Sequence, residues 1–258
     1  MRCHVCSHAY CCPIPEHIGD NYRDVVDEEY LKHATSRKLA AEAVIAVIYR
    51  LVQSGRLLDV GCATGDLLEA ARDRQYLAEG LELSEWSSQI AAGKGFIIYK
   101  EYLASLAERL PNHFDVITLM GVIEHFAEPA EEMNSICKLL KPNGIVVIWT
   151  GDVNSITSRA LGRKWWYWQG QHIQYFTHAS LKRLVGLCGL SHLKTNIYPF
   201  VATFETISNS LRRYRSHRTL RQLIRPLFGL KQVWYIRLPG EMLFIAKKPP
   251  CPGINSGG

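Results

Sequence analysis

The chain has 258 residues, enough for one large domain or for one domain plus an appendage, and its 47% hydrophobic and 21% charged residues are ordinary for a soluble globular protein. It contains no run of about 18 apolar residues and no apolar signal core at its N-terminus, so we expect a cytoplasmic protein without a transmembrane helix. The net charge of +6 is local, because no acidic residue lies between Glu205 and Glu241 while eight arginines and lysines do.

Four cysteines cluster near the start of the chain, in an N-terminal extension that we place at residues 1–27. Cys3 and Cys6 have the two-residue spacing of a zinc knuckle. Structural zinc needs four ligands, however, and Cys11 and Cys12 follow sooner than a second knuckle normally does. Two interpretations stay open: a weak zinc site formed by these four cysteines, or a terminus with free thiols.

Apolar residues at helical spacing predict one helix over residues 28–53. Short apolar runs then alternate with helical segments, which predicts an α/β fold with a Rossmann-like, mostly parallel sheet and helices on both faces. The predicted strands lie at residues 57–60, 76–83, 96–99, 113–120, 145–150, 193–200 and 241–247. The predicted helices between them lie at residues 66–72, 85–93, 103–110, 128–140 and 180–188.

A glycine turn joins the first strand to the next helix, between Gly61 and Gly65. Such a turn lets the backbone approach a ligand and points helix N–H groups at it. A dinucleotide site needs a third glycine, whose place Ala63 takes here. Asp59 before the turn suits a cationic group, and Glu82 at the end of the second strand can accept from two ribose hydroxyls. These residues indicate a cationic nucleoside, and S-adenosylmethionine (SAM) fits.

Five motifs, in order and with matching spacing, resemble those of class I SAM-dependent methyltransferases. They are Leu58–Gly65, Gly80–Ser84, Phe114–Ile117, Val122–His125 and Leu139–Gly144. The branch that they resemble contains the ubiquinone-biosynthesis O-methyltransferases, and some of its members carry an N-terminal cysteine knuckle. The resemblance implies a seven-stranded sheet with an antiparallel last strand, SAM as cofactor and S-adenosylhomocysteine (SAH) as product.

The same resemblance assigns roles to individual residues. It places residues around the methionine moiety, the ribose, the adenine and the sulfonium: Asp59, Gly61, Cys62, Gly65, Glu82, Leu83, Tyr102, Leu103, Met120 and Gly121. Ubiquinone-type enzymes also have a glutamate, linked to a divalent metal, three residues before their Glu-His pair. Gly121 stands at that position here, which argues against a catalytic metal.

Two histidines are candidates for the general base that an oxygen acceptor needs. His125 follows the fourth strand, at the sheet edge where α/β proteins bind ligands. His172 lies in a segment that resembles the element over the acceptor pocket in this branch. Either histidine can take a proton near neutral pH, and either can instead make a structural hydrogen bond.

The segment at residues 151–176 is aromatic and irregular, which predicts a lid on the acceptor side. Its run of rings, residues 165–168, can line a pocket for an aromatic, sugar or lipid-linked acceptor, or it can pack as the edge of the lid. The methyltransferase domain would then cover residues 28–248, and residues 249–258 would form a disordered tail.

The basic insertion at residues 206–238 has an apolar side within residues 210–229. It can contact an anionic membrane surface, bind nucleic acid or form a solvated cap over the active site. Nucleic acid is the least favoured, because no RNA-binding module accompanies the charge. We expect a methyltransferase for a small-molecule acceptor. The alternatives are an RNA or protein methyltransferase and a non-catalytic SAM-binding protein, and the sequence leaves the oligomeric state open.

Overall fold

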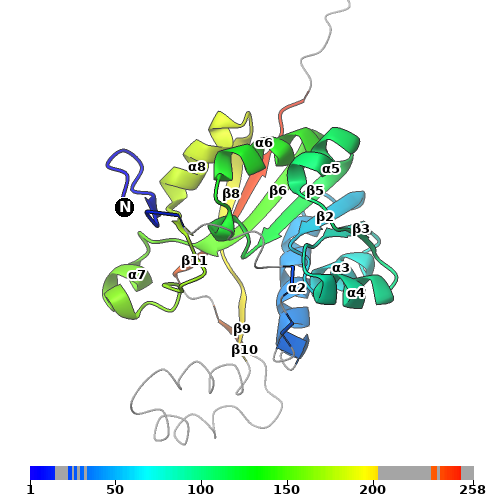
Figure 1. Ribbon diagram of the computed structural model, residues 1–258, viewed down its shortest axis with the longest axis horizontal. Coiled ribbons are helices and arrows are strands. Elements are labelled where there is room, and N and C mark those ends of the chain that lie inside the picture. The colour runs from blue at the N-terminus through cyan, green and yellow to red at the C-terminus, as the bar shows by residue number, and fades with distance from the viewer. Residues whose placement is uncertain are drawn as a thin grey trace, which may run out of the picture.

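The computed structural model describes residues 1–14, 23–24, 26–27, 30–31, 34–202, 234–236 and 239–250. Its centre is a seven-stranded sheet in the order β4-β3-β2-β5-β6-β11-β8 (Figure 1). Its strands are β2 (Arg56–Val60), β3 (Leu77–Leu81), β4 (Ile97–Tyr99), β5 (Phe114–Met120), β6 (Leu140–Gly151), β8 (Ser191–Ile197) and β11 (Glu241–Lys247). The order is that of a doubly wound sheet, with β2 and β5 side by side at its middle.

Every contact between neighbouring strands from β4 to β6 is parallel, whereas β11 runs antiparallel to both β6 and β8. The predicted Rossmann-like sheet with an antiparallel last strand is therefore confirmed. β11 lies between β6 and β8 because its run of apolar side chains is buried on both faces of the sheet.

Helices cover both faces of this sheet. They are α2 (Ala34–Tyr49), α3 (Asp66–Arg72), α4 (Glu85–Gly93), α5 (Leu103–Arg109), α6 (Pro129–Leu139), α7 (Ile156–Leu161) and α8 (His178–Leu187). Successive strand residues point to opposite faces, so Leu57 packs in the core with α2 and α3, while Leu58 packs in the core with α5, α6 and α8. Two hydrophobic cores thus clamp the sheet and fix the positions of its strand ends.

Two helices begin at residues whose side chains cap them. Ser84 accepts a hydrogen bond from the backbone N–H of Ser87 at the start of α4. Thr177 forms a reciprocal capping box with Ser180 at the start of α8. Each cap satisfies donors that the first turn of a helix leaves free, so these helix starts are defined locally.

Two predicted boundaries are wrong. The helix expected to reach residue 53 ends at Tyr49, and the chain turns before Gly55, which adopts φ +132°. The strand expected at residues 145–150 begins at Leu140, directly after α6, where a turn was predicted. Leu140 pairs with Phe114 of β5 through an irregularity in the ladder, which carries the strand past Pro142 and Gly144.

The lid segment, residues 151–176, is more regular than predicted. It contains α7, the 3₁₀ turn η3 (Gly162–Lys164) and the short strand β7 (Gln174–Tyr175). A small core of its own forms from Val153, Trp165, Tyr167 and Tyr175. This core holds the lid as a packed layer at the carboxyl edge of the sheet.

The start of the chain is docked on this lid. β1 (Ala9–Tyr10) pairs antiparallel with β7, and the backbone N–H of Cys11 donates to the carbonyl of Ile173 over 2.9 Å. The hydroxyl of Thr177 donates to the carbonyl of Cys6, also over 2.9 Å. Residues 1–14 therefore extend the lid, whatever the cysteines bind.

A second small ladder pairs β9 (Phe200–Ala202) with β10 (Trp234–Ile236). Residues 210–229, the part of the basic insertion with the predicted apolar side, lie outside the described residues. The predicted tail lies outside them from residue 251 onward. None of the described helices is both long and apolar enough to span a membrane.

Candidate functional site

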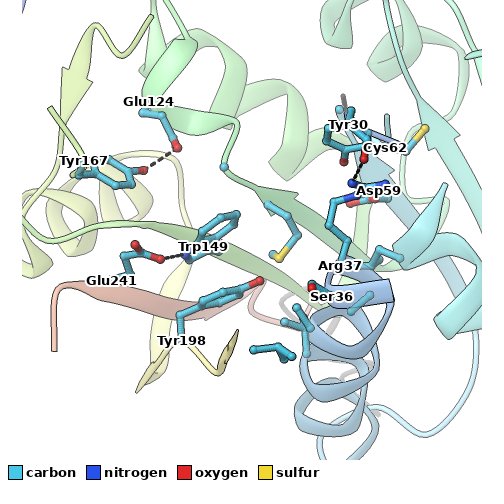
Figure 2. A pocket seen from close by; sticks show the side chains of 18 of the residues that line it. Tyr30, Ser36, Arg37, Asp59, Cys62, Glu124, Trp149, Tyr167, Tyr198 and Glu241 are labelled. Atoms are coloured by element: carbon cyan, nitrogen blue, oxygen red, sulfur yellow. Dashed lines mark hydrogen bonds between the residues drawn. The ribbon is translucent and has the colours of Figure 1, made fainter. Parts of the chain in front are cut away.

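A cavity of about 500 Å³ opens at the carboxyl ends of β2, β5 and β6. Figure 2 shows it between helix α2 on one side and the lid on the other. We call its two parts the cofactor half and the acceptor half. The cofactor half is lined by Tyr30, Ser36, Arg37, Ala40, Ala41, Val44, Asp59, Gly61, Cys62 and Leu67. The acceptor half is lined by Glu124, Trp149, Trp166, Tyr167, Gln169, His172, Tyr198, Val201 and Glu241, and Met120 and Gly121 lie between the halves.

The glycine turn closes the floor of the cofactor half. Gly61 has φ +68°, and a Cβ there would lie 2.7 Å from a methyl carbon of Val122. Gly65 has φ +85° at the start of α3. Glycine is therefore required at both positions for conformation, and at Gly61 also for space. The turn brings its backbone to the cavity, as expected of a ligand-binding turn.

Asp59 lies at the end of β2 with its carboxylate buried. The hydroxyl of Thr118 on the neighbouring strand donates to Asp59 Oδ1 over 2.6 Å. Burial raises the pKa of Asp59 to about 7, against the opposing effect of this hydrogen bond. A buried carboxyl with a raised pKa is poised to ionise when a cationic group comes beside it.

Arg37 is a lining residue that the sequence analysis did not single out. Its Nε donates to Asp66 over 2.6 Å, its Nη1 donates to the carbonyl of Tyr30, and its guanidinium lies over the Tyr30 ring at 3.5 Å. Its Nη2 is buried without a hydrogen-bond partner. A buried charged donor without a partner is costly, so this atom indicates where a ligand carboxylate would bind. The only signal in the sequence was an arginine in the helix before the glycine turn.

Glu82 is hydrogen-bonded to the glycine turn and does not line the cavity. Its Oε2 accepts from the backbone N–H of Ala63 over 2.9 Å, and its Oε1 accepts from that of Ser84 over 2.8 Å. Each carboxylate oxygen keeps a second lone pair, so both can still accept from neighbouring hydroxyls. Of the predicted cofactor residues, Gly65, Glu82, Leu83, Tyr102 and Leu103 lie outside the lining of the cavity.

Two of these outlying residues begin α5. Tyr102 is the N-cap residue of that helix and is 43% exposed, and Leu103 is buried in the core. Tyr102 also meets the guanidinium of Arg23, whose Cζ lies 5.6 Å from the ring centroid. The predicted adenine contact of Leu103 therefore has its side chain in the core and not at the cavity wall.

An unusual carboxylate forms the far wall of the acceptor half. Glu241, the first residue of β11, accepts from the indole N–H of Trp149 over 2.9 Å and from that of Trp166 over 2.6 Å. The Trp149 ring stacks on Tyr198, with ring centroids 4.3 Å apart (Figure 2). Burial raises the pKa of Glu241, and the two indole hydrogen bonds oppose that rise. Three strands and the lid meet at this residue.

Glu124 is the second carboxylate of this half and is only 2% exposed. Its Oε1 accepts from the hydroxyl of Tyr167 over 2.5 Å, and its Oε2 accepts from that of Thr150 over 3.1 Å. Burial raises the pKa of Glu124 to about 7, and these hydrogen bonds oppose the rise. The sequence analysis named Glu124 only as part of a motif, and the structure makes it a wall residue.

The two predicted bases lie together but differ in access. The rings of His125 and His172 are T-shaped at 4.9 Å, and His172 lines the cavity whereas His125 does not. The Nδ1 atom of His125 lies 2.9 Å from the carbonyl of Gln171, and that of His172 lies 2.9 Å from the carbonyl of Tyr167. A carbonyl only accepts, so each ring carries its proton on Nδ1 and has a lone pair on Nε2.

Burial lowers the pKa of both histidines. The pKa of His125 falls to about 4, with the charge of His172 adding to the effect of burial. The pKa of His172 is also lowered by burial, against the hydrogen bond to Tyr167. Both rings are therefore neutral at neutral pH and ready to accept a proton, although as weaker bases than an exposed histidine.

Glu124, His125 and His172 each offer a ligand atom, and these atoms lie within 4.8 Å of one another. Gly121 offers no side chain where the ubiquinone-type enzymes have a glutamate, so one ligand of their metal site is missing here. The residues present therefore do not fit the metal site of those enzymes. Among the described residues, no comparable group forms around Cys3 and Cys6, so the zinc site stays a prediction.

The aromatic run divides between the two functions that its sequence allowed. Trp166 and Tyr167 line the cavity, while Trp165 is 2% exposed and packs inside the lid core. Trp168 is 41% exposed and lies against Tyr175 with ring centroids 4.4 Å apart. The two middle residues of the run thus line the cavity, and the two outer residues pack within the lid.

Comparison with known proteins adds a family match. A sequence model of the family described as "Methyltransferase domain" matches residues 30–195, more than half of the chain. The ubiquinone biosynthesis O-methyltransferase of Paracidovorax citrulli is 34% identical over 111 residues, which are 40% of this chain and 47% of that protein. The enzyme of the same name from Idiomarina loihiensis is 28% identical over 155 residues, 55% of this chain and 63% of that protein. The chain spans about half the length of the curated relatives it matches.

Solved structures share the fold at low identity. A SAM-dependent methyltransferase from Archaeoglobus fulgidus gives a TM-score of 0.57 at 20% identity, with 86% of this chain and all of that one covered. The [4+2]-cyclase SpnF gives the same TM-score at 18% identity, with 81% of this chain and 82% of that one covered. Because a cyclase shares this fold, the fold alone does not identify the reaction. The reaction has to be argued from the residues of the site.

Proposed function

The chain belongs to the methyltransferase domain family, and from that premise we propose that it binds SAM and transfers the methyl group to an oxygen or carbon of a small molecule. One observation carries the proposal. A single cavity joins the glycine turn, with Asp59 and Arg37, to a lined chamber that contains Glu124 and His172. Donor and acceptor can therefore meet inside one cavity, with Met120 and Gly121 between them.

The cofactor half supplies a partner for each polar part of SAM. The free Nη2 of Arg37 suits the methionyl carboxylate, and the carboxylate of Asp59 suits the α-ammonium group. Glu82, already oriented by two backbone N–H groups, has lone pairs for the two ribose hydroxyls. These contacts extend the predicted cofactor residues by Arg37.

The methyl group on a sulfonium is already activated for in-line displacement, so SAM supplies the driving force of the reaction when bound. The protein then has to position the acceptor, exclude water and remove a proton. His172 is the better placed of the two predicted bases, because it lines the cavity and has a free lone pair on Nε2. His125 lies behind it, where its ring supports that of His172.

The alternatives differ in where the methyl group would go. An RNA or protein methyltransferase would use the basic insertion, of which the structure describes only residues 234–236. A SAM-binding protein without turnover would keep the cofactor half alone. The wall of Glu124, Trp166 and Tyr198 favours a small-molecule acceptor, because it encloses the space beside the predicted methyl group. A lipid-linked, sugar or aromatic acceptor would each suit such a wall.

The experiment is an incubation of the protein with SAM carrying a labelled methyl group and with separate small-molecule, protein and RNA fractions of a cell extract. The proposal predicts label in the small-molecule fraction, and a His172→Gln variant that still binds SAH but transfers at least about a hundredfold more slowly. Label in RNA or protein would contradict the small-molecule assignment. SAH binding without label in any fraction would favour the non-catalytic alternative.

Contact of residues 210–229 with an anionic membrane also stays a proposal. It rests on the arginines of that segment and on their separation from acidic residues. Flotation with vesicles of phosphatidylserine and phosphatidylcholine tests it directly. The proposal predicts that the protein floats at low salt and is released at high salt, and failure to float at low salt would overturn it.

A further inference from the structure

The acceptor half contains more carboxyl groups than the proposed chemistry requires. Glu124 and Glu241 both line it, and Asp59 lies across the cavity in the cofactor half. The one cationic side chain among the described lining residues is Arg37, and it forms an ion pair with Asp66 at 2.6 Å. His172 is neutral, because burial lowers its pKa. The described lining therefore holds three carboxyl groups and one cationic side chain.

Bound SAM would balance only part of this charge. Its carboxylate and ammonium group neutralise each other, so the sulfonium leaves one net positive charge, which lies at the junction of the two halves. Under the proposed function, the ammonium group of SAM pairs with the carboxylate of Asp59. Glu241, on the far wall, is then left without a cationic partner among the described residues, and a carboxylate enclosed by aromatic rings is stabilised when a cation binds beside it.

The two indole groups favour the ionised form of Glu241 and so oppose the burial that raises its pKa. Each of its oxygens accepts from one N–H donor, and donors directed at both oxygens favour the carboxylate over the acid. The same indole groups fix the carboxylate in the wall, so that it cannot rotate away into solvent. A negative charge is thereby held at a defined point of the acceptor chamber.

The rings around Glu241 also suit a cation. Trp149, Trp166 and Tyr198 all line the chamber, and the stacking of Trp149 on Tyr198 at 4.3 Å holds both rings rigidly. Aromatic faces attract organic cations within about 6 Å, and most strongly where water is excluded. A carboxylate framed by aromatic rings is a combination that recognises an ammonium group and repels an anion.

We propose that the acceptor carries an organic ammonium group and that Glu241, framed by Trp149, Trp166 and Tyr198, binds it. This inference rests on the proposed function and names the substrate class for the same site. The ammonium group anchors the molecule at the far wall and leaves its reacting oxygen or carbon toward His172 and the junction at Met120. Acceptors that are anionic at this end are excluded.

Three probes of one shape test the charge preference. Tyramine, para-propylphenol and para-hydroxyphenylpropionate share a phenol ring and a chain of similar length, and they end in a cation, a neutral group and an anion. Binding of each is measured by calorimetry to the SAH-loaded protein at about pH 8, above the pKa of about 7 of Glu124. We expect tyramine to bind about tenfold more tightly than propylphenol and the anionic probe to bind least.

The variant Glu241→Gln removes the charge and keeps an oxygen for one indole donor. We expect it to reduce the preference for tyramine over propylphenol to about twofold or less. Glu108→Gln is the matched control, because Glu108 pairs with Lys138 on the surface, away from the cavity. It should keep the wild-type preference, and SAH affinity, measured first for each protein, reports an intact cofactor half.

The outcomes separate the two proposals. Equal affinities of the three probes for the SAH-loaded wild type would overturn the ammonium site and leave the proposed function standing. A tyramine preference that Glu241→Gln does not change would also overturn it. Failure of the folded wild type to bind SAH would sink the proposed function itself. The wild-type series decides the question even if the variant does not fold.

Discussion

The two halves of the cavity are built in different ways. The cofactor half comes from two segments that are close together in the sequence: residues 30–44, mostly in α2, and residues 59–67, from the end of β2 through the glycine turn. The acceptor half is assembled from segments far apart in the sequence. Glu124 follows β5, Trp149 lies on β6, Trp166 belongs to the lid and Glu241 begins β11.

This difference separates what is fixed by local backbone geometry from what is fixed by packing. The glycine turn depends on φ angles and on one close contact, that of Gly61 with Val122, so few sequences can form it. The Glu241 site instead needs β11 beside β6 and the lid over both. The first half therefore depends mainly on local backbone conformation, and the second on the pairing of distant segments.

The largest effect should come from the cofactor half. Glu82→Ala removes an acceptor for two ribose hydroxyls and also two hydrogen bonds to the glycine turn. Each charge-assisted hydrogen bond contributes about 1.5–3 kcal/mol, so SAH affinity should fall by about a hundredfold or more. Calorimetry with SAH measures this, with circular dichroism to verify the fold. Unchanged affinity in a folded variant would refute the ribose assignment.

The next largest effect tests whether Arg37 binds the carboxylate of the cofactor. Arg37→Met removes the unpartnered Nη2 donor and keeps most of the side-chain volume. SAH affinity should fall by about tenfold, as expected for one charge-assisted hydrogen bond. Methylthioadenosine, which lacks the amino-acid carboxylate, serves as the matched ligand and should bind both proteins alike. Equal losses for both ligands would show that Arg37 acts on the fold and not on the carboxylate.

A smaller effect concerns pH. Burial raises the pKa of Asp59 and of Glu124 to about 7 in the folded chain. The folded protein thus holds protons that the unfolded chain releases above about pH 4, and this contribution to stability is lost as pH rises through about 7. Buried histidines act in the opposite direction only below their ordinary pKa of about 6.5.

The melting temperature of the ligand-free protein should therefore fall between about pH 6.5 and 8.5. Asp59→Asn should reduce that fall, and saturating SAH should reduce it as well, since an ammonium group beside Asp59 favours the ionised form. Thermal denaturation by circular dichroism across this range is the measurement. A melting temperature that rises through the range, or an identical slope for Asp59→Asn, would contradict the assignment.

The smallest effect is expected on SAH affinity when a residue of the acceptor half is changed. Glu241→Gln changes the acceptor wall, where no part of the cofactor is placed, so its SAH affinity should stay within about twofold of the wild type. The same variant should lose the preference for cationic probes. If Glu241→Gln instead lowered SAH affinity by about tenfold or more, the two halves would not be separable as described.

Much of the fold could be predicted from the sequence, because its strands and caps are local. β11 matches its predicted bounds, and Ser84 and Thr177 cap the helices assigned to them. The predictions were wrong where long-range pairing decides. Leu140 joins β6 because it pairs with Phe114. The local sequence does not indicate this contact, because Pro142 and Gly144 follow Leu140 and are typical of a turn.

The candidate site follows the same rule. Residues beside the glycine turn could be named from the sequence, whereas Glu241 could not, because its indole partners lie 92 and 75 residues away. An acidic residue at the start of an otherwise apolar strand was the only signal. Arg37 could not be named from the sequence for a similar reason. Its unpartnered Nη2 donor becomes evident only when α2 lies over the glycine turn.

The central claim is that the cofactor half binds SAM, and titration of the wild-type protein with SAH tests it most directly. The account predicts saturable one-to-one binding by calorimetry, lost in Glu82→Ala and weakened in Arg37→Met. Binding of adenosine with the same affinity as SAH, or no binding of SAH to a protein that is folded by circular dichroism, would contradict it.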